Sequence, residues 1–97
     1  MKATPISKIY ADHAPLLNTT LLLNGWVRTI RDSKTFGFIE LNDGSYLKNI
    51  QIVFEDKLDN FDAICRLGVG SAISVEGILV ASQGGKQAFE IQASKVD

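Results

Sequence analysis

The sequence is short of the residues that most small catalytic sites need. It has one cysteine, Cys65, and one histidine, His13, and the two lie far apart in the chain. A Cys–His nucleophile or a zinc site requires several such side chains close together. A single cysteine also provides no internal disulfide, which fits a reducing compartment. We therefore expect no catalysis, no metal site and no cofactor within this chain.

Long apolar runs are also missing. No stretch approaches the length that spans a bilayer, and the N-terminal segment lacks the apolar centre of a signal peptide. These absences predict a cytoplasmic protein without a membrane partner. At 97 residues with 45% hydrophobic composition, the chain is long enough for one compact domain and too short for two. We expect residues 1–97 to form that single domain.

An excess of positive charge is absent as well. Ten Lys and Arg residues stand against eleven Asp and Glu residues, which gives a formal net charge of −1. This balance argues against a protein that coats DNA through charge alone. The charges are unevenly placed, because Arg28, Arg31 and Lys34 precede an acidic segment that runs from Glu55 to Asp62. We therefore expect one face that accepts phosphates and another that repels them.

The N-terminal segment, residues 1–18, has the pattern of a short helix that packs on the rest of the domain. Thr4 followed by Pro5 is typical of a helix start, with Thr4 as the cap. Ile6 and Ile9 then recur at helical spacing. We interpret this segment as packing.

Alternating apolar and polar residues predict five strands. Three leucines precede Gly25 and break the alternation, which indicates a bend or bulge that lets one strand serve two sheets. Gly77 indicates a second bulge, and the glycine-rich run 83–86 predicts a hairpin between the last two strands. The predicted strands cover residues 21–30, 36–41, 49–54, 72–80 and 87–96.

Two connections between these strands have recognisable patterns. The run 42–45, Asn-Asp-Gly-Ser, is a strong turn signal because Asn, Asp and Gly tolerate left-handed backbone. Apolar residues at helical spacing within 58–65 predict a helix that plugs the core. We expect Asp56 or Asp59 to cap this helix and Gly68 to end it.

Five strands with a helix between the third and the fourth follow the order of the OB-fold. We therefore expect an all-β protein, a five-stranded Greek-key barrel preceded by a short N-terminal helix. Closing so short a meander into a barrel removes its exposed edges. OB-folds bind oligonucleotides on the surface of their central strands and the adjoining loops, so this surface is the expected binding site.

The second and third predicted strands carry side chains suited to unpaired bases. Phe36, Phe38 and Glu40 share the outer face of the second strand, as its period of two requires. Phe38 can stack on a base, a contact worth ~1–3 kcal/mol. Gln51 on the third strand offers both a donor and an acceptor to a base edge. These side chains predict RNA binding.

The cations nearest to this surface are Arg28, Arg31 and Lys86, and we expect them to contact phosphate or a base edge. Other interpretations stay open. The two arginines can pair with Asp32 or Glu40 at the surface, where ion pairs contribute little stability. A neighbouring domain can cover the two phenylalanines, and the lysine can simply be solvated.

The runs GWVRTIRDSKTFGFIELNDGS and NIQIVF closely resemble the N-terminal anticodon-binding domain of the class II aminoacyl-tRNA synthetases for aspartate, asparagine and lysine. The resemblance covers nearly the whole chain. It implies that Phe38 stacks on the middle anticodon base, that Gln51 hydrogen-bonds that base, and that Arg31 precedes the first loop. Within the family, the chain is most similar to the asparagine enzymes of bacterial type. Glu40 is a candidate for contact with a flanking base.

The resemblance implies two partners, the anticodon loop of tRNA and the catalytic domain of a full-length synthetase. That catalytic domain is not in this chain, so we expect no enzyme activity here, and we expect ATP and Mg to bind only to the catalytic domain. The isolated domain is expected to be monomeric. Three alternatives stay open: an anticodon domain of the aspartyl or lysyl branch, a stand-alone OB-fold that binds single-stranded nucleic acid, and a protein-interaction module.

Overall fold

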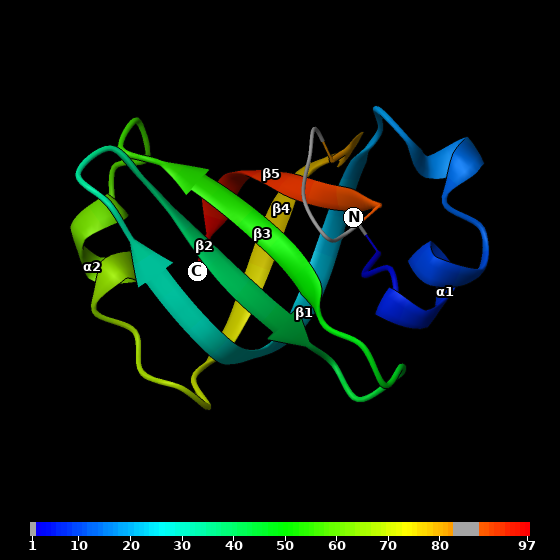
Figure 1. Ribbon diagram of the computed structural model, residues 1–97, viewed down its shortest axis with the longest axis horizontal. Helices are drawn as coiled ribbons and strands as arrows, with labels where there is room; N and C mark the ends of the chain where they lie inside the picture. The colour runs from blue at the N-terminus through cyan, green and yellow to red at the C-terminus, as the bar shows by residue number, and fades with distance from the viewer. Residues whose placement is uncertain (1, 83–87) are drawn as a thin grey trace.

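The computed structural model describes residues 2–82 and 88–97 of the chain. The hairpin predicted at 83–86, with Lys86, lies outside these residues. The strands are β1 (Thr20–Asp32), β2 (Phe36–Asn42), β3 (Ile50–Glu55), β4 (Ala72–Ala81) and β5 (Phe89–Val96), and they form a closed barrel in the order β1-β2-β3-β5-β4 (Figure 1). The helical elements are α1 (Ile6–Ala11), a 3-10 turn (Ala14–Leu16) and α2 (Phe61–Cys65). The predicted all-β OB-fold barrel is confirmed.

The interior of the barrel is filled by one side of each strand. In β2 the residues at 37, 39 and 41 are buried, and in β3 those at 50, 52 and 54, so the period of two predicted from the sequence holds in both strands. No buried polar or charged residue interrupts this core within the described part of the chain. The largest fully buried side chains include Phe54, Leu23, Ile39, Ile52, Leu79 and Ile91.

Strand β1 serves both sides of the barrel, as the sequence predicted. It pairs with β4 from Thr20 to Trp26 and with β2 from Trp26 onward. Gly25 lies beside the changeover, where a Cβ would stand 2.4 Å from the carbonyl oxygen of Asn42. No larger residue fits so close to another backbone. The bulge predicted at Gly77 is confirmed by a register shift between Glu76 and Gly77.

A further register shift in β1, between Val27 and Thr29, was not predicted. It leaves Arg28 as an extra residue opposite β2. In the part of β1 that follows, the side chains that face inward and outward are therefore exchanged. Beyond the shift, Thr29 pairs with Glu40, and Arg31 pairs with Phe38. The bulge therefore brings Arg31 to the outer face of the barrel beside Phe38.

Helix α1 begins in a different way from the one predicted. The N-cap is Pro5, whereas Thr4 lies before the helix and its N–H donates to the carbonyl of Leu22 at 2.8 Å. The cap comes from the β2–β3 turn instead. Asp43 Oδ2 accepts from the backbone N–H of Ile6 at 3.0 Å, and the hydroxyl oxygen of Ser45 accepts from the N–H of Ser7 at 3.0 Å. The prediction of Thr4 as the cap is wrong because this threonine is held by β1.

Helix α2 lies across the barrel from α1 in Figure 1. Its Ile64 is buried in the core, which confirms the predicted plug. Both predicted ends are wrong. The N-cap is Asn60, with no side-chain cap hydrogen bond, and the C-cap is Arg66, before Gly68. The Asn60 amide instead donates to the carbonyl of Val96 at 2.7 Å, so the start of α2 is tied to the end of β5.

Candidate nucleic-acid interface

The outer face of β1, β2 and β3 carries two rows of side chains that run across the strands. In one row Arg31 lies opposite Phe38, and Phe38 lies opposite Val53. In the next row Thr29, Glu40 and Gln51 lie opposite one another. Residues that face each other across antiparallel strands have their Cβ atoms about 5 Å apart. The face therefore places an aromatic ring, a cation, a carboxylate and an amide within the reach of one or two nucleotides.

Phe38 is half-buried and is held on both sides by neighbouring side chains. The guanidinium carbon of Arg31 lies 5.2 Å from the centre of the Phe38 ring, a cation–π distance. The ring of Phe36 meets the Phe38 ring edge-on, with 5.3 Å between centroids and 88° between planes. These contacts fix the orientation of the ring and leave it accessible on the outer face. A base that stacks there finds a ring that is already positioned.

The expected alternative for the arginines, ion pairs with Asp32 or Glu40, is not seen. Within residues 2–82 and 88–97 an ion pair joins Lys95 and Asp97, and none involves an arginine. Arg31 and Asp32 instead border an open recess of about 290 Å³ beside the two phenylalanines. The guanidinium of Arg31 thus keeps its hydrogen-bond donors available for a phosphate or a base edge.

Glu40 and Gln51 occupy the neighbouring row, and both are partly buried. A carboxylate oxygen of Glu40 accepts from the Asn49 amide at 3.4 Å. The oxygen of Asn49 in turn accepts from the Asn42 amide at 2.9 Å. This chain of amides holds Glu40 in place next to Gln51. The row therefore presents hydrogen-bonding groups of defined orientation.

A larger recess of about 620 Å³ adjoins Glu40 on the side of α1, and sequence reasoning did not find it. Tyr10 and Phe89 help to line it, with their rings 5.1 Å apart and edge-on. The hydroxyl of Tyr10 donates to the carbonyl of Asn49 at 2.5 Å. Burial raises the pKa of Tyr10, and the nearby charges of Tyr46 and Glu40 raise it further. The helical spacing of the N-terminal segment indicated packing alone, and no local signal showed that Tyr10 contacts Asn49, just before β3.

Comparison with known proteins identifies the family. Residues 21–97 match the tRNA anti-codon family, described as an OB-fold nucleic acid binding domain. The chain belongs to this family. The resemblance to a synthetase anticodon-binding domain, noted from the sequence, is thereby confirmed.

Relatives of this anticodon-family domain include asparagine–tRNA ligases. The ligase of Clostridium kluyveri is 47% identical over 96 residues, which is 99% of this chain and 21% of the relative. The ligase of Acetivibrio thermocellus is 52% identical over 98 residues, which is 100% of this chain and 21% of the relative. The chain thus spans about a fifth of the length of these curated relatives.

Among solved structures, asparaginyl-tRNA synthetase from Pyrococcus horikoshii complexed with asparaginyl-adenylate superposes on the domain with a TM-score of 0.84. The sequence identity is 21%, and the match covers 100% of this chain and 22% of the other. At this identity the likeness is one of fold. It agrees with the closed barrel and the helix order of the anticodon-family domain.

The predicted site residues of the domain fall into three groups. Arg31, Phe38, Glu40 and Gln51 are brought together in the two rows described above. Arg28 is exposed at the bulge in β1, beside the rows and outside their register. The predicted Lys86 lies outside the described residues.

Sequence reasoning missed Gln92 of β5. It extends the first row, because β5 pairs in parallel with β3 and Gln92 lies opposite Val53. No local pattern announces this neighbour, since parallel strands that close a barrel are far apart in the chain. The alternation of Ile91 and Gln92 alone indicated that Gln92 faces outward.

Across the described residues no three or more His, Cys, Asp or Glu side chains gather in a way that holds a metal ion. The described helices are all too short or too polar to cross a membrane.

Burial raises the pKa of the Cys65 thiol, and the nearby carboxylates of Asp32 and Asp62 raise it further. The raised pKa keeps this thiol protonated, and a protonated thiol is a weak nucleophile.

Proposed function

We propose that this chain recognises the anticodon loop of an asparagine tRNA as part of an asparagine–tRNA ligase. The observation that carries the proposal is the pairing of Phe38 with Arg31, beside Gln51, on the outer face of the barrel. Oligonucleotide-binding OB-folds use this face. The relatives at 47% and 52% identity, both named asparagine–tRNA ligase, support the choice of tRNA.

The residues of the site have three kinds of role in this proposal: stacking on a base, hydrogen bonding to a base edge, and contact with the RNA backbone. Phe38 stacks on the middle base of the anticodon, a uridine, and Gln51 hydrogen-bonds the edge of that base. Arg28, Arg31 and Lys86 hold the RNA backbone. Stacking itself is tolerant of sequence because every base has an aromatic face, so specificity for the middle base comes from the amide of Gln51.

The flanking bases distinguish asparagine tRNA from those for aspartate and lysine, because the middle uridine is common to all three. Glu40 is the candidate reader of one flanking base. Its carboxylate accepts hydrogen bonds and donates none, so it favours a base that presents an amino group. The contact with Asn49 orients the carboxylate for this task.

The domain itself carries no catalysis in this proposal. Activation of asparagine with ATP and Mg, and transfer to tRNA, belong to the catalytic domain of the ligase. Binding of the anticodon to the barrel helps to place the acceptor end of the tRNA at that distant site. The isolated domain needs no cofactor, is monomeric, and works in the cytoplasm.

The test is a titration of the 97-residue chain with RNA stem-loops that carry the asparagine anticodon loop. Replacing the middle uridine with cytidine should weaken binding, since the edge presented to Gln51 changes. Phe38→Ala should weaken binding to the cognate loop by ~1–3 kcal/mol while the domain stays folded. Equal affinity for the two loops in the wild-type chain would contradict the proposal.

The same titration separates the alternatives. An OB-fold that binds single strands with little sequence preference would bind unrelated oligonucleotides equally well and show a steep dependence on salt. A protein-interaction module would bind none of the RNAs. An NMR shift map of the bound loop adds a second measurement, because recognition of the anticodon predicts shifts at Phe38 and Gln51, not at α2.

A further inference from the structure

Helix α1 lies beside the connection between β2 and β3, residues 43–49 (Figure 1). The helix is fixed to the barrel, because its Ile6 and Ile9 are fully buried in the core. Tyr10, the next residue, is partly buried and packs on the connection. Helix α1 is therefore a fixed support against which the connection is held.

Tyr10 holds the connection at two points. Its ring stacks on that of Tyr46, with 4.7 Å between centroids and 25° between planes. Its hydroxyl donates to the backbone carbonyl of Asn49 at 2.5 Å, which is a short hydrogen bond. The raised pKa of Tyr10, caused first by burial, keeps the hydroxyl protonated, so it remains a donor. The residue that precedes β3 is thus fixed relative to α1.

Asn49 passes this restraint to the outer face of β1, β2 and β3. Its side-chain oxygen accepts from the Asn42 amide at 2.9 Å, and its own amide donates to the Glu40 carboxylate at 3.4 Å. The second hydrogen bond is long, so a small displacement of Asn49 is enough to break it. Glu40 lies opposite Gln51 in the register of β2 and β3. The position of the Glu40 carboxylate beside Gln51 therefore depends on where Tyr10 holds Asn49.

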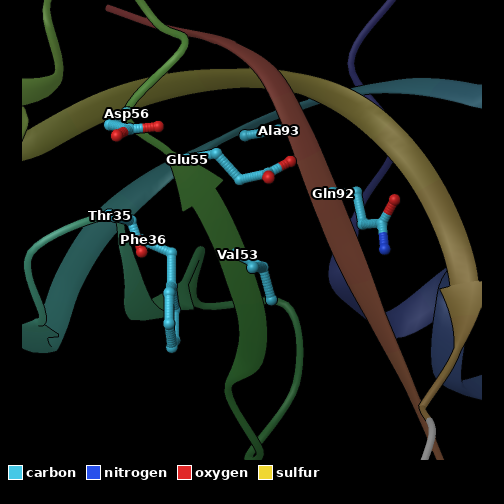
Figure 2. A pocket seen from close by; sticks show the side chains of 7 residues that line it. All are labelled: Thr35, Phe36, Val53, Glu55, Asp56, Gln92 and Ala93. Atoms are coloured by element: carbon cyan, nitrogen blue, oxygen red, sulfur yellow. The ribbon is translucent and has the colours of Figure 1, made fainter.

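A second carboxylate on the same face lacks this support. Glu55 is exposed at the other end of β3, where it borders a recess of about 300 Å³ (Figure 2). The residues that line this recess come from β2, β3, β5 and the adjoining loops. Among the described residues no ion pair or hydrogen bond holds the Glu55 carboxylate. Glu40 and Glu55 thus share a face and a charge, and they differ in their connection to α1.

We propose that Tyr10 is a positioning residue for RNA binding, because it holds Asn49 and, through Asn49, the carboxylate of Glu40. The inference rests on the proposed function, in which Glu40 contacts the bound RNA. It gives α1 a part in the affinity for RNA without any contact between the helix and the RNA. Loss of the Tyr10 hydroxyl alone should therefore weaken binding.

The experiment is a double-mutant cycle on the affinity of the 97-residue chain for a stem-loop with the asparagine anticodon. Tyr10→Phe removes the hydroxyl and keeps the ring, so the stacking on Tyr46 is retained and the domain stays folded. It should weaken binding about three- to tenfold, in the range expected for one lost hydrogen bond. In the Glu40→Ala background the same substitution should change the affinity by less than about 1.5-fold, because the group that Tyr10 positions is gone.

Two matched controls separate positioning from general effects. Tyr46→Phe makes the same chemical change in the ring that stacks on Tyr10, and among the described residues no hydrogen bond involves the Tyr46 hydroxyl. It should leave the affinity unchanged. Glu55→Ala removes the unsupported carboxylate, and Tyr10→Phe should weaken binding as much in this background as in the wild-type chain. Equal effects of Tyr10→Phe in the Glu40→Ala and Glu55→Ala backgrounds would overturn the inference.

The outcomes also separate this inference from the proposed function. A chain that binds loops with and without the central uridine equally well contradicts the proposed function. A chain that requires this uridine, and loses affinity on Glu40→Ala but not on Tyr10→Phe, overturns the inference and leaves the proposed function intact. If Glu40→Ala has no effect on affinity, Glu40 does not contact the RNA, and the inference is overturned together with that role.

The side-chain amide signals of the free domain provide a measurement that a simple loss of stability would not move. Tyr10→Phe should shift the NMR signals of the Asn49 and Asn42 amides, which lie in the hydrogen-bonded chain. The Asn60 amide, which donates to the Val96 carbonyl, is the internal reference and should stay unchanged. An unshifted Asn49 amide in Tyr10→Phe would show that Tyr10 does not position this residue.

Discussion

The two faces of strand β2 are built from adjacent residues, yet their side chains are held in opposite ways. On the inner face, Gly37 lies so close to the core that a Cβ would stand 2.3 Å from the ring of Phe54. On the outer face, Phe36 is 40% exposed and touches Phe38 edge-on. The inner face thus has no spare room, whereas the outer face presents its groups to a partner. Stability and recognition are carried by alternate residues of one strand.

The largest expected effect is the difference in stability between truncating Ile39 on the inner face and truncating its neighbour Phe38 on the outer face. Ile39 is fully buried, so Ile39→Ala should lower the free energy of unfolding by ~2–5 kcal/mol, through lost burial and a new cavity. Phe38→Ala should cost about 1 kcal/mol or less, because the ring is half-buried. Urea denaturation of the two variants checks the difference. Equal losses would mean that the outer face is structural.

The second effect concerns the space above Gly37. Gly37→Ala should destabilise the domain by ~1–3 kcal/mol, because the added methyl group forces the Phe54 ring away from its position. Gly68→Ala is the matched control, since a Cβ at Gly68 meets nothing within 4 Å. Thermal unfolding of both variants measures the contrast. A wild-type melting temperature for Gly37→Ala would show that the core has room the structure does not reveal.

The third effect is the contribution of the Asp43 cap on α1 to the stability of the domain. Asp43 belongs to neither face of β2. Burial alone would raise the pKa of Asp43, but hydrogen bonds from the Ser45 hydroxyl and from the N–H groups of Ile6 and Ser45 outweigh it and lower the pKa. Asp43→Ala should cost ~0.5–2 kcal/mol, the usual loss for a helix cap.

The sign of the pH dependence at this cap follows from the lowered pKa. The stabilising contribution is present above the ordinary pKa of 3.8 and disappears as the pH falls through the lower folded value. Wild-type stability should therefore drop more steeply in acid than that of Asp43→Ala. The control is Asp59→Ala at an exposed aspartate. A difference between wild type and Asp43→Ala that stays constant in acid would contradict the role of the carboxylate.

The smallest change in stability is expected at Arg31. Its cation–π contact with Phe38 is exposed, so Arg31→Gln should cost about 0.5–1 kcal/mol. The same variant should bind anticodon stem-loops more weakly, and the slope of log affinity against log salt should fall by about 0.7 if one phosphate contact is lost. Lys8→Gln on α1 removes one charge away from the face and should leave the slope unchanged. An unaltered slope for Arg31→Gln would assign the arginine to a base edge.

Much of the fold could be predicted because it is encoded locally. The period of two in β2 and β3 showed which residues face the core, and the turn chemistry from Asn42 to Ser45 is seen in the left-handed Gly44, whose φ is 81°. The bulge at Gly77 also followed from the sequence, since glycine inside a strand often marks one. These features depend on neighbours in the chain.

The errors and omissions all depend on contacts between distant segments. The cap of α1 comes from Asp43, which is 37 residues from Ile6, whereas a short window of sequence favours the nearer Thr4. The register shift beside Arg28 appears only when β2 is laid against β1. Gln92 joins the outer face because β5 closes the barrel against β3. None of these arrangements leaves a signal within a short window of sequence.

The short pairing between β3 and β5 has a consequence for the motions of the barrel. The Val53–Gln92 pair ends this junction, so local opening should begin there sooner than in the longer β2–β3 ladder. Amide hydrogens at the junction should then exchange with solvent earlier than those at the centre of β2. RNA that lies across Val53 and Gln92 on the outer face would contact both strands at this junction. Bound RNA would then oppose the separation of β3 and β5, and the amide hydrogens of β5 should exchange more slowly in the complex than in the free domain.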